Sequence, residues 1–491
     1  MNPLSIPTDT RPDTILAPLI VDLDGTLTPT DTLLESIVYV LKHKPREALK
    51  FPFKILQGRA AFKEFVAAKS NFTAEDIPYR VAFLDYLRGE KKKGRRIILA
   101  TAAHGEIADK VAKHLDIFDG VLASDSTKNL KGAAKLNAIR ASVGDSFVYA
   151  GDSTADVPIW KAAQAAILVG VSPRIAATVR QSTPIEHEFP REDAGIRTWL
   201  RALRVHQWVK NLLLFVPMLT AFSFLNIDKL TSMVMAFFAF SLAASATYLV
   251  NDLLDLESDR AHPRKRRRPL ASAQISIAQA MAMAIGALMI ALMLAAAVSQ
   301  NFFFMLLLYL ALTSLYSWVL KKHVLIDVLT LSMLYTLRIL AGAIAAGVMA
   351  SSWLLAFSVF IFFSLALVKR CAELVAIAQM GQDATHGRDY RVADLVVLWP
   401  LGVGSALCAV VVFGLFISAD ETQARYASPQ LLWLVAMGLI YWLSRLWIKS
   451  ARGEMHDDPI VFAARDLGSR ISVLAMLATT LAAHFLTLGL A

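Results

Sequence analysis

Residues 251–269 read NDLLDLESDRAHPRKRRRP and place a group of carboxylates directly before a run of cations, at the end of a long apolar segment. On a helix, Asp252, Asp255 and Asp259 fall at positions i, i+3 and i+7 and share one face. Such carboxylates repel one another, and Mg²⁺ relieves that repulsion because it takes oxygen ligands and completes its shell with substrate phosphates. The stretch therefore predicts a magnesium and diphosphate site at a membrane surface, with Asn251 as a further ligand.

The cations that follow can neutralise the remaining phosphate charge. Those expected to bind substrate phosphate are Arg260, Lys265, Arg266 and Arg268. Lys and Arg are also enriched on any cytoplasmic loop of a membrane protein, so these cations have a second explanation. The carboxylates also have a second explanation, because acidic residues at a helix end can belong to a solvated loop. Three aspartates at helical spacing favour the functional interpretation.

Composition divides the chain into a soluble and a membrane part. Of the 491 residues, 56% are hydrophobic and 18% are charged, and after about residue 211 the charged residues are largely confined to short loops. We predict a soluble domain at 1–195, an interfacial linker helix at 196–210 and a membrane domain at 211–491. The net charge of +10 suits anionic lipids and phosphate-bearing ligands, and its spread over loops argues against nucleic acid. Two cysteines in or beside apolar spans indicate neither a disulfide framework nor a thiolate metal site.

In the first domain, short apolar runs alternate with helical patterns, as expected of a parallel sheet covered by helices. The runs are 19–23, 97–100, 120–123, 147–150 and 166–169, and the helical patterns include 106–114 and 133–142. Active groups in such sheets follow the carboxyl ends of strands. The polar residues at these places are Asp22, Asp24, Thr101, Asp152 and Asp156, with Lys131 and Lys135 at the start of an intervening helix.

These motifs, in this order over about residues 17–171, resemble the four motifs of the haloacid-dehalogenase-like (HAD) phosphohydrolases. The resemblance implies a Rossmann-like α/β domain with a small helical cap, here about residues 29–94. It makes Asp22 the nucleophile that forms an acyl phosphate and Asp24 the general acid and then base. Its alternative is a HAD scaffold that has lost catalysis and serves in regulation or docking.

The same resemblance implies a Mg²⁺ site made by Asp22, Asp24, Asp152 and Asp156. The Thr101 hydroxyl and a lysine would steady the transferring phosphoryl oxygens. The Lys-Gly-Ala-Ala-Lys spacing favours Lys135 for this role, and Lys131 stays as the alternative. The N-terminus lacks a basic segment followed by an apolar one, so this domain is expected in the cytosol.

From residue 211 onward we predict an all-α membrane bundle of about nine spans, each near the length that a bilayer requires. The spans are 211–226, 230–250, 275–298, 302–320, 324–348, 352–368, 394–418, 429–448 and 471–490. Most Lys and Arg of this part lie in the loops 251–272, 321–323, 369–393 and 449–470. These loops are therefore expected on the cytosolic side of a bacterial inner membrane, together with the first domain.

Nine spans, an Asn-Asp-x-x-Asp-x-x-x-Asp stretch after the second and a charged loop after the sixth resemble the UbiA prenyltransferase superfamily, from about residue 204 to the end. The extended forms Arg204-x-x-Gln-Trp-x-Lys-Asn211 and Asp259-Arg-x-His-Pro-x-Lys-Arg-x-Arg-Pro269 look like the polyprenyl-phosphate phosphoribosyltransferases. Such enzymes transfer phosphoribose from phosphoribosyl diphosphate (PRPP) to a polyprenyl phosphate. The resemblance adds as substrate-binding residues Lys210, Asn211, Tyr316, Lys321 and Lys322.

The loop after the sixth span departs from that of aromatic prenyltransferases, which carry a second Asp-x-x-x-Asp there. Here the loop begins Lys369-Arg370-Cys-Ala-Glu373. A lipid monophosphate needs positive charge and no leaving-group metal, so Lys369 and Arg370 favour the phosphoribosyl interpretation over charges that only fix topology. Glu373 stays as a secondary metal contact, and Asp389 as a weaker one.

Arg338 lies inside the fifth predicted span, where a charge is costly. It is expected either to bind substrate phosphate or to pair with an intramembrane polar group such as Asp327.

Together these features predict a bifunctional Mg²⁺-dependent membrane enzyme. Phosphoribose would pass from PRPP to a polyprenyl phosphate, and the HAD domain would dephosphorylate the product to polyprenylphosphoryl ribose. The nearer alternative moves a prenyl group from a prenyl diphosphate to an aromatic or other acceptor, with the HAD domain acting on a separate phosphate. The more distant one is a regulated transporter, which would require an inverted repeat or paired half-helices.

Overall fold

The computed structural model describes residues 16–125, 128–191, 194–381, 383, 388–455 and 458–487. The chain divides into two compact units. The first combines Met1–Ala202 with Leu249–Ala282, and the second combines Leu203–Tyr248 with Met283–Ala491. The aspartate-rich stretch thus belongs to the same compact unit as the N-terminal domain.

The first unit is built on a parallel six-stranded sheet with the strand order β3-β2-β1-β4-β5-β6. Its strands are β1 (Leu19–Val21), β2 (Ile97–His104), β3 (Gly120–Ser124), β4 (Val148–Gly151), β5 (Ala165–Val169) and β6 (Ile185–Phe189). Ile20 of β1 pairs with Ile98 of β2 and Tyr149 of β4, so the carboxyl ends of these three strands lie side by side. The predicted α/β fold is confirmed. The sequence missed β6, since this edge strand exposes the polar residues between Ile185 and Phe189.

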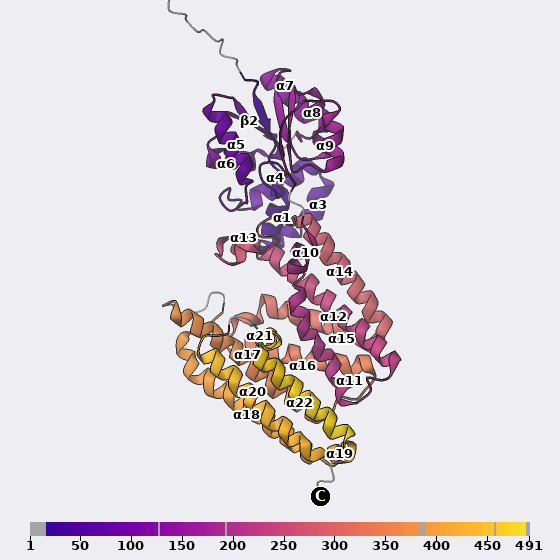
Figure 1. The fold of residues 1–491 in the computed structure, drawn as a ribbon. Helices are drawn as coiled ribbons and strands as arrows, with labels where there is room; N and C mark the ends of the chain where they lie inside the picture. Colours follow the sequence, from indigo (N-terminus) through magenta and orange to yellow (C-terminus); the bar gives the residue numbers. More distant parts are fainter. Residues whose placement is uncertain are drawn as a thin grey trace, which may run out of the picture. The chain divides into compact units, whose positions relative to one another are not determined.

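Helices cover both faces of the sheet, as Figure 1 shows with α5 and α6 on one flank and α8 and α9 on the other. The covering elements are α5 (Val81–Lys92), α6 (Gly105–Leu115), α7 (Ala133–Val143), η1 (Thr154–Asp156), α8 (Val157–Ala162) and α9 (Pro173–Arg180). Successive strand residues point to opposite faces, so Leu19 and Val21 pack with Phe83 of α5 while Ile20 packs with Trp160 of α8. The short strands therefore have a buried core on each side.

A helical cap follows β1. It consists of α1 (Thr32–His43), α2 (Pro45–Ala48), α3 (Phe51–Leu56) and α4 (Arg59–Lys69). The Asp31 carboxylate accepts hydrogen bonds from the backbone N–H groups of Leu33 and Leu34 and so caps α1. The remaining helix of the predicted cap region, α5, packs against the sheet instead.

Residues 249–282 complete the first unit. α12 (Ile227–Leu254) ends here, followed by α13 (Leu256–Ala261), η3 (Lys265–Arg267) and the start of α14 (Ile277–Val298). The expected single helix carrying Asp252, Asp255 and Asp259 is interrupted at Asp255, which sits at the N-cap position of α13. The Asp255 side chain makes no cap hydrogen bond, and the Asp259 backbone N–H still donates to the Asp255 carbonyl at 2.8 Å, so the interruption is confined to Asp255.

The predicted linker helix is also divided. α10 (Ile196–Ala202) belongs to the first unit, and η2 (Val205–Phe215) begins the second. Between them Arg204 adopts a left-handed backbone conformation with φ of 51°, which ends one helix before the next begins.

The second unit is a helical bundle, drawn in the lower part of Figure 1. Besides η2 and parts of α12 and α14, it contains α11 (Val216–Thr220), α15 (Gln300–Trp318), η4 (Leu320–Lys322), α16 (Ile326–Ala346), α17 (Ser352–Gln379), η5 (Val392–Asp394), α18 (Leu395–Ser418), α19 (Asp420–Arg425), η6 (Pro429–Leu431), α20 (Leu432–Ala451), α21 (Pro459–Arg465) and α22 (Leu467–Phe485).

Eight helices within the described residues are long and apolar enough to cross a membrane. They contain α12, α14, α15, α16, α17, α18, α20 and α22. The prediction of a polytopic bundle is confirmed, and about nine spans is close to this count. The difference is the segment 211–226, which is divided between η2 and the short α11. Pro217 at the start of α11 cannot donate to a continuing helix, which accounts for the division.

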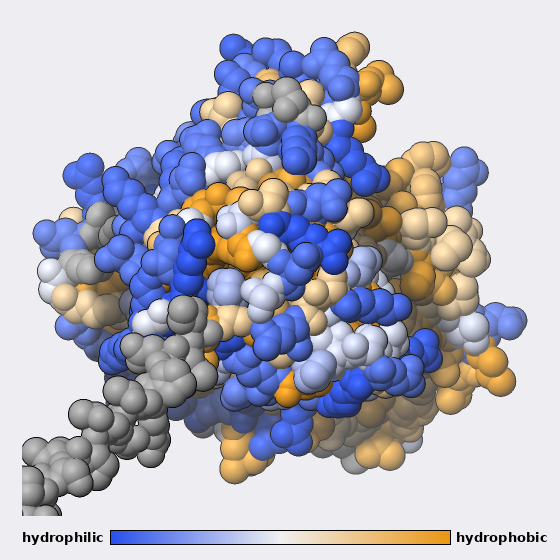
Figure 2. Space-filling view, turned by 90° about the horizontal axis from the view of Figure 1, so that it is seen from above, coloured by the Kyte–Doolittle hydropathy of each residue, from blue (hydrophilic) through white to orange (hydrophobic). Residues whose placement is uncertain are grey.

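Surface composition follows the same division of the chain. Side chains such as Met293 of α14 and Val396 of α18 are exposed, as a lipid-facing surface requires. Figure 2 shows one face that is mainly hydrophilic, with hydrophobic groups gathered mostly toward its margin. The chain therefore carries both a water-facing and a lipid-facing surface.

Candidate active sites

The carboxyl end of β1 delivers Asp22 to the centre of the first site. Asp22 is buried, and its Oδ1 accepts hydrogen bonds from the Leu23 backbone N–H at 2.8 Å and from Lys135 Nζ at 2.9 Å. Lys135 is also buried and donates to the Tyr149 hydroxyl at 3.1 Å. Of the two lysines that the sequence left open, Lys135 therefore contacts Asp22, whereas Lys131 is an exposed residue at the edge of the cavity.

Three carboxylates gather beside this lysine. Asp22, Asp152 and Asp156 each bring an oxygen within 4.8 Å of the others, and the described residues contain no second group of three metal-ligating side chains as close. Asp156 is held by the Tyr149 hydroxyl at 2.7 Å and the Ser153 hydroxyl at 2.9 Å. A Cβ on Gly25 would come within 2.2 Å of Asp152, so the close approach of this turn to the carboxylate requires glycine. The donor set is all oxygen and fits Mg²⁺.

The site has too little positive charge to balance its carboxylates. Burial raises the pKa of Asp152 to about 7, and the charges of Asp156 and Asp22 act in the same direction. Burial also raises the pKa of Asp22, although Lys135 opposes the effect. For Lys135, burial alone would lower the pKa, but the charges of Asp22 and Asp156 raise it above its usual value. One lysine does not balance three carboxylates, two of which belong to the buried residues Asp22 and Asp156, so a divalent cation suits the remaining charge.

Asp24 differs from the expectation that it helps to bind the metal. Its carboxylate lies outside the group of three and accepts a hydrogen bond from the Thr32 backbone N–H at 2.8 Å, because α1 begins there. Burial, reinforced by the charge of Asp31, raises the pKa of Asp24 to about 7. Thr101 is buried in β2, and its hydroxyl oxygen accepts from the Ala103 backbone N–H at 3.0 Å. Asp24 thus has the protonation behaviour of an acid and base near neutral pH.

A cavity of about 700 Å³ opens over these groups. Asp22, Asp24 and Asp152 line its floor, the cap contributes Lys63 and Ile55, and residues 276–278 before and within α14 form part of its wall. Lys63 Nζ donates to the Ala102 carbonyl at 2.6 Å and to the Asn129 side chain at 2.9 Å. The cavity is therefore lined by acidic groups together with a lysine and apolar side chains.

In the aspartate-rich segment, Arg268 joins two of the predicted metal ligands. Its guanidinium donates to Asp252 at 3.1 Å and to Asp259 at 2.5 Å. Asp255 is partly exposed and lies 3.8 Å from Lys42 of α1. The other oxygen of Asp259 is buried without a hydrogen-bond partner in the described part of the chain, and Lys265 Nζ is 4.0 Å away. An unpartnered carboxylate oxygen is the type of ligand that magnesium takes.

The predicted phosphate-binding cations of this segment have different surroundings. Both terminal nitrogens of Arg260 donate to Glu35 of α1, at 2.6 and 3.1 Å, and its Nε donates to the Ala271 carbonyl at 3.1 Å. Lys265 and Arg266 are exposed, and Asn251 is partly buried. Arg260 is therefore fixed by the cap, while Lys265 and Arg266 face solvent.

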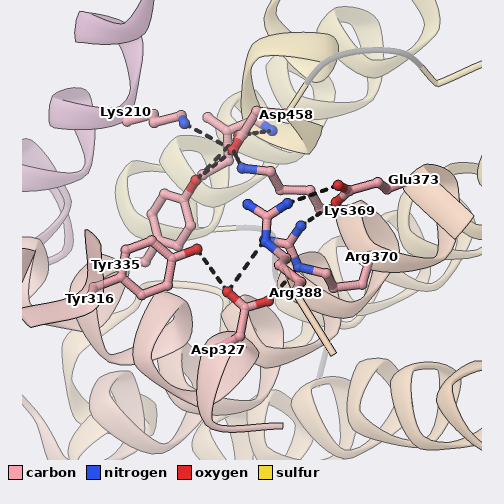
Figure 3. Close-up of polar contacts among 10 residues, drawn as sticks. Lys210, Tyr316, Asp327, Tyr335, Lys369, Arg370, Glu373, Arg388 and Asp458 are labelled. Atoms are coloured by element: carbon pink, nitrogen blue, oxygen red, sulfur yellow. Dashed lines mark hydrogen bonds and ion pairs between the residues drawn. The ribbon is translucent and has the colours of Figure 1, made fainter. Parts of the chain in front are cut away.

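The second unit has a charge cluster centred on Asp458, which precedes α21 (Figure 3). Its carboxylate accepts hydrogen bonds from Lys210 Nζ at 2.9 Å, Lys369 Nζ at 3.3 Å and the Tyr335 hydroxyl at 3.1 Å. Burial would raise the pKa of Asp458, but the charges of Lys369 and Lys210 hold it well below its usual range. Sequence reasoning predicted both lysines and missed Asp458, although Asp457-Asp458-Pro459 in the last charged loop was an available signal.

A second network occupies the same view in Figure 3. Arg370 is buried and donates to Asp327 at 2.5 Å and to Glu373, while Arg388 donates to Glu373 at 2.8 Å. The Tyr316 hydroxyl donates to Asp327 at 2.7 Å. Arg370 is therefore neutralised by two carboxylates, and Glu373 pairs with cations. Lys321 and Lys322 lie in η4, and Lys322 is exposed.

Arg338 has partners other than Asp327. Its Nε donates to Asn211 at 3.0 Å, and its terminal nitrogens donate to the Tyr309 hydroxyl at 2.8 Å and to the Leu334 carbonyl at 2.6 Å. Its polar partners in the bundle are thus Asn211 and Tyr309, whereas Asp327, the example that the sequence offered, accepts from Arg370 and Tyr316. Arg338 and Asn211 instead form one buried polar network.

Comparison with known proteins connects both sites to families. Residues 212–489 match the UbiA prenyltransferase family, and residues 19–161 match the haloacid dehalogenase-like hydrolases. The uncharacterized protein y4nM of Sinorhizobium fredii is 38% identical over 455 residues, which are 91% of this chain and 87% of that protein. An alignment of this length includes most of both domains.

Two further relatives align with a little over half of the chain. Nodulation protein NoeC of Azorhizobium caulinodans is 33% identical over 57% of this chain and 91% of its own length. Decaprenyl-phosphate phosphoribosyltransferase of Mycobacterium tuberculosis is 31% identical over 58% of this chain and 93% of its own length. With its N-terminal HAD-like domain and its membrane-spanning bundle, the chain belongs to the UbiA prenyltransferase family.

Proposed function

We propose that the chain is a bifunctional enzyme of polyprenyl phosphate metabolism. Its UbiA domain transfers 5-phosphoribose from PRPP to a polyprenyl phosphate and releases diphosphate, and its HAD domain removes the 5-phosphate to give polyprenylphosphoryl ribose. The observation that carries the proposal is the convergence of Lys210, Lys369 and Tyr335 on one buried, anion-sized position, which the Asp458 carboxylate fills. The name of the 31% identical relative from M. tuberculosis supports the choice of substrates.

In the transfer step, Lys210 and Lys369 bind the phosphate of the lipid acceptor. Each ammonium has three donors and uses one on Asp458, so both can also donate to a phosphate. Asp458 positions the two lysines and keeps their like charges close together. A phosphate oxygen of the acceptor attacks the anomeric carbon, and the bond from that carbon to diphosphate breaks, with the electron pair leaving on diphosphate.

Asn251, Asp252, Asp255 and Asp259 would hold Mg²⁺ in the transferase. The ion supplies charge neutralisation on the departing diphosphate. Lys265, Arg266 and Arg268 neutralise the phosphate charge that remains. Arg338 donates to Asn211 and so holds this amide in place within the bundle.

In the phosphatase step, the two contacts to Asp22 both involve Oδ1, so we assign Oδ2 as the attacking atom. It forms a bond to phosphorus while the bond to the ribose 5-oxygen breaks, and protonated Asp24 gives its proton to that oxygen. Asp24 then accepts a proton from water, which attacks the aspartyl phosphate and releases inorganic phosphate. Lys135 stabilises the negative charge near Asp22, and Thr101 steadies a phosphoryl oxygen.

Asp22, Asp152 and Asp156 would hold the magnesium ion of the phosphatase. It supplies electrophilic activation of the phosphoryl group. We place both reactions on the cytosolic side of a bacterial inner membrane, because PRPP is a water-soluble metabolite and the Lys- and Arg-rich loops follow the positive-inside rule.

Mass spectrometry of lipids tests both halves together. Purified protein is incubated with Mg²⁺, PRPP and a polyprenyl phosphate, and the products are extracted. We expect polyprenylphosphoryl ribose from the wild type and its 5-phosphate from Asp22→Asn. Asp255→Ala should form neither product. Consumption of a prenyl diphosphate with an aromatic acceptor, and none of PRPP, would instead establish prenyl transfer.

A further inference from the structure

The cap of the phosphatase exposes a group of large apolar side chains. Leu49, Phe53, Ile55 and Leu56 are 76%, 69%, 59% and 85% exposed, and all lie within eight residues on and just before α3. Burying such side chains is a main source of folding free energy, so a water-facing domain rarely displays them together. Contiguous exposed apolar groups mark a surface that contacts something else.

The charges around these side chains identify what it contacts. Residues 44–59, which we name the cap docking segment, read KPREALKFPFKILQGR and contain five cations and one acid. Lys50 pairs with the single acid, Glu47, and Lys54 donates to the Gln57 side chain at 2.9 Å. Apolar side chains interleaved with Lys and Arg are typical of segments that lie in the headgroup region of anionic membranes.

The cap docking segment and the start of a candidate membrane span line the same cavity. Ile55 of the segment lines the cavity, and so do Ser276, Ile277 and Ala278. Ile277 is the first residue of α14, one of the eight candidate membrane spans. The Ser276 hydroxyl accepts from the Gln279 backbone N–H at 3.2 Å, and Gln279 accepts from the Ser276 N–H at 3.0 Å, which fixes the start of the helix. A cavity walled by the start of a membrane span lies where that span leaves the bilayer.

We propose that the cap docking segment inserts Leu49, Phe53 and Leu56 into the surface of an anionic bilayer and holds the mouth of the phosphatase cavity against it. The HAD domain then takes its phosphomonoester from a lipid in the headgroup layer. The docking itself rests on exposure, charge and the position of α14. The identity of the lipid-linked substrate rests on the proposed function.

Depth-dependent quenching tests the docking without any reaction. In a Cys408→Ser background, an environment-sensitive fluorophore is attached to Phe53→Cys or Leu56→Cys, and the full chain is placed in nanodiscs with spin-labelled lipids. The matched control is Lys113→Cys, an exposed site on α6. We expect strong quenching at the two cap sites, more with phosphatidylglycerol than with phosphatidylcholine, and little at position 113.

Equal quenching at all three sites, or none at the cap sites, would overturn the proposal. If the cap sites lost their solvent exposure only as the protein concentration rose, a second copy of the chain would be the partner, and the lipid assignment would also be wrong.

A triple variant, Leu49→Ser with Phe53→Ser and Leu56→Ser, tests the consequence for catalysis. We expect kcat/KM for polyprenylphosphoryl ribose 5-phosphate in nanodiscs to fall at least about tenfold, since three apolar side chains lose their membrane contact. Hydrolysis of water-soluble ribose 5-phosphate should stay within about twofold of the wild type, because the variant spares the cavity. Val81→Ser, which removes an exposed apolar side chain on α5, should change neither rate.

Equal losses on both substrates would refute a role in lipid delivery. A wild type that is quenched at the cap but hydrolyses neither substrate would contradict the proposed phosphatase function and leave the docking intact.

Discussion

At the scale of single residues, both sites depend on charges that are nearly but not fully balanced. Lys135 faces Asp22 and Asp156, and Asp458 faces Lys210 and Lys369. In each case one charged side chain lies between two side chains of the opposite sign, which would otherwise repel one another. Each site therefore carries a residual charge opposite to that of its proposed ligand, negative for magnesium and positive for a lipid phosphate.

Magnesium binding at the phosphatase site should depend on pH. The pKa of Asp152, one of the three proposed ligands, is raised to about 7 in the absence of metal, and magnesium binds its ionised form. Protons therefore compete with the metal below pH 7, and we expect the dissociation constant to be about tenfold larger at pH 6 than at pH 8 for each proton released. Calorimetric titration with Mg²⁺ measures this dissociation constant in the Asp255→Ala protein, in which the proposed magnesium site of the transferase is removed.

An affinity that is equal at both pH values would show that the carboxylates are already ionised. Asp152→Asn should weaken binding at pH 8, because it removes one of the three ligands.

Lys369 should matter for the lipid acceptor more than for the donor. Lys369→Met removes one ammonium group and keeps a chain of similar length, so we expect the KM for polyprenyl phosphate to rise about tenfold with the KM for PRPP nearly unchanged. Steady-state kinetics of the transfer step measure both. Lys229→Met, at a partly exposed site in the first turn of α12, is the control. A rise confined to the KM for PRPP would assign Lys369 to the donor.

The two sites differ in how far the sequence could predict them. Asp22, Asp152, Asp156 and Lys135 could be predicted because each lies in a motif beside a strand or helix that hydrophobic runs already mark. Asp458 was missed because the Asp457-Asp458-Pro459 stretch does not indicate a partner: Lys210 lies 248 positions away, and only the bundle brings the two together. A local sequence pattern is enough to find residues in motifs, whereas the role of Asp458 depends on contacts between distant parts of the chain.

At the scale of elements, breaks in helices shape the sites. α12 ends at Leu254 and α13 begins at Leu256, and Arg268 donates to Asp252 of the first helix and to Asp259 of the second. Hydrophobic periodicity predicted the spans well because their length is set by the bilayer. It did not predict the division of 211–226, because an apolar pattern does not register the backbone donor that Pro217 lacks.

The close packing of α16 on η2 provides a test at this scale. A Cβ on Gly342 of α16 would lie 1.9 Å from the Leu214 carbonyl oxygen of η2, so the two backbones pack directly against each other. We expect Gly342→Ala to destabilise the protein by about 1–3 kcal/mol, as overpacking does. Thermal unfolding in detergent, followed by tryptophan fluorescence, measures the change.

Gly286→Ala in α14 is the matched control, because its Cβ would meet no atom within 4 Å. Alanine favours a helix over glycine, so this variant should be neutral or slightly more stable. Equal melting temperatures for the two variants would contradict the close packing of α16 on η2.

At the scale of the whole molecule, sequence order and compact units do not coincide. Residues 249–282 lie within the UbiA part of the sequence, yet they belong to the first unit. Glu35 of the cap and Arg260 of this segment are 225 positions apart and form a two-point ion pair. The division into a soluble and a membrane part could be predicted from composition, but this exchange of a segment could not, because it rests on individual long-range contacts.

Fusion of the two activities should matter when the intermediate cannot leave its bilayer. Asp22→Asn should transfer phosphoribose without dephosphorylating the product, and Asp255→Ala should do the reverse. When the two variants are mixed in nanodiscs that each hold one chain, we expect the 5-phosphorylated lipid to accumulate, because polyprenyl chains leave a bilayer slowly. Wild-type discs should yield the dephosphorylated product, since both sites belong to one chain.

Liposomes that contain both variants provide the control, because lateral diffusion then lets the intermediate reach a working phosphatase and the final product should return. If the mixed single-chain discs matched the wild type, the phosphatase substrate would have to pass through water. A lipid-linked intermediate would then be excluded, even with both active sites intact.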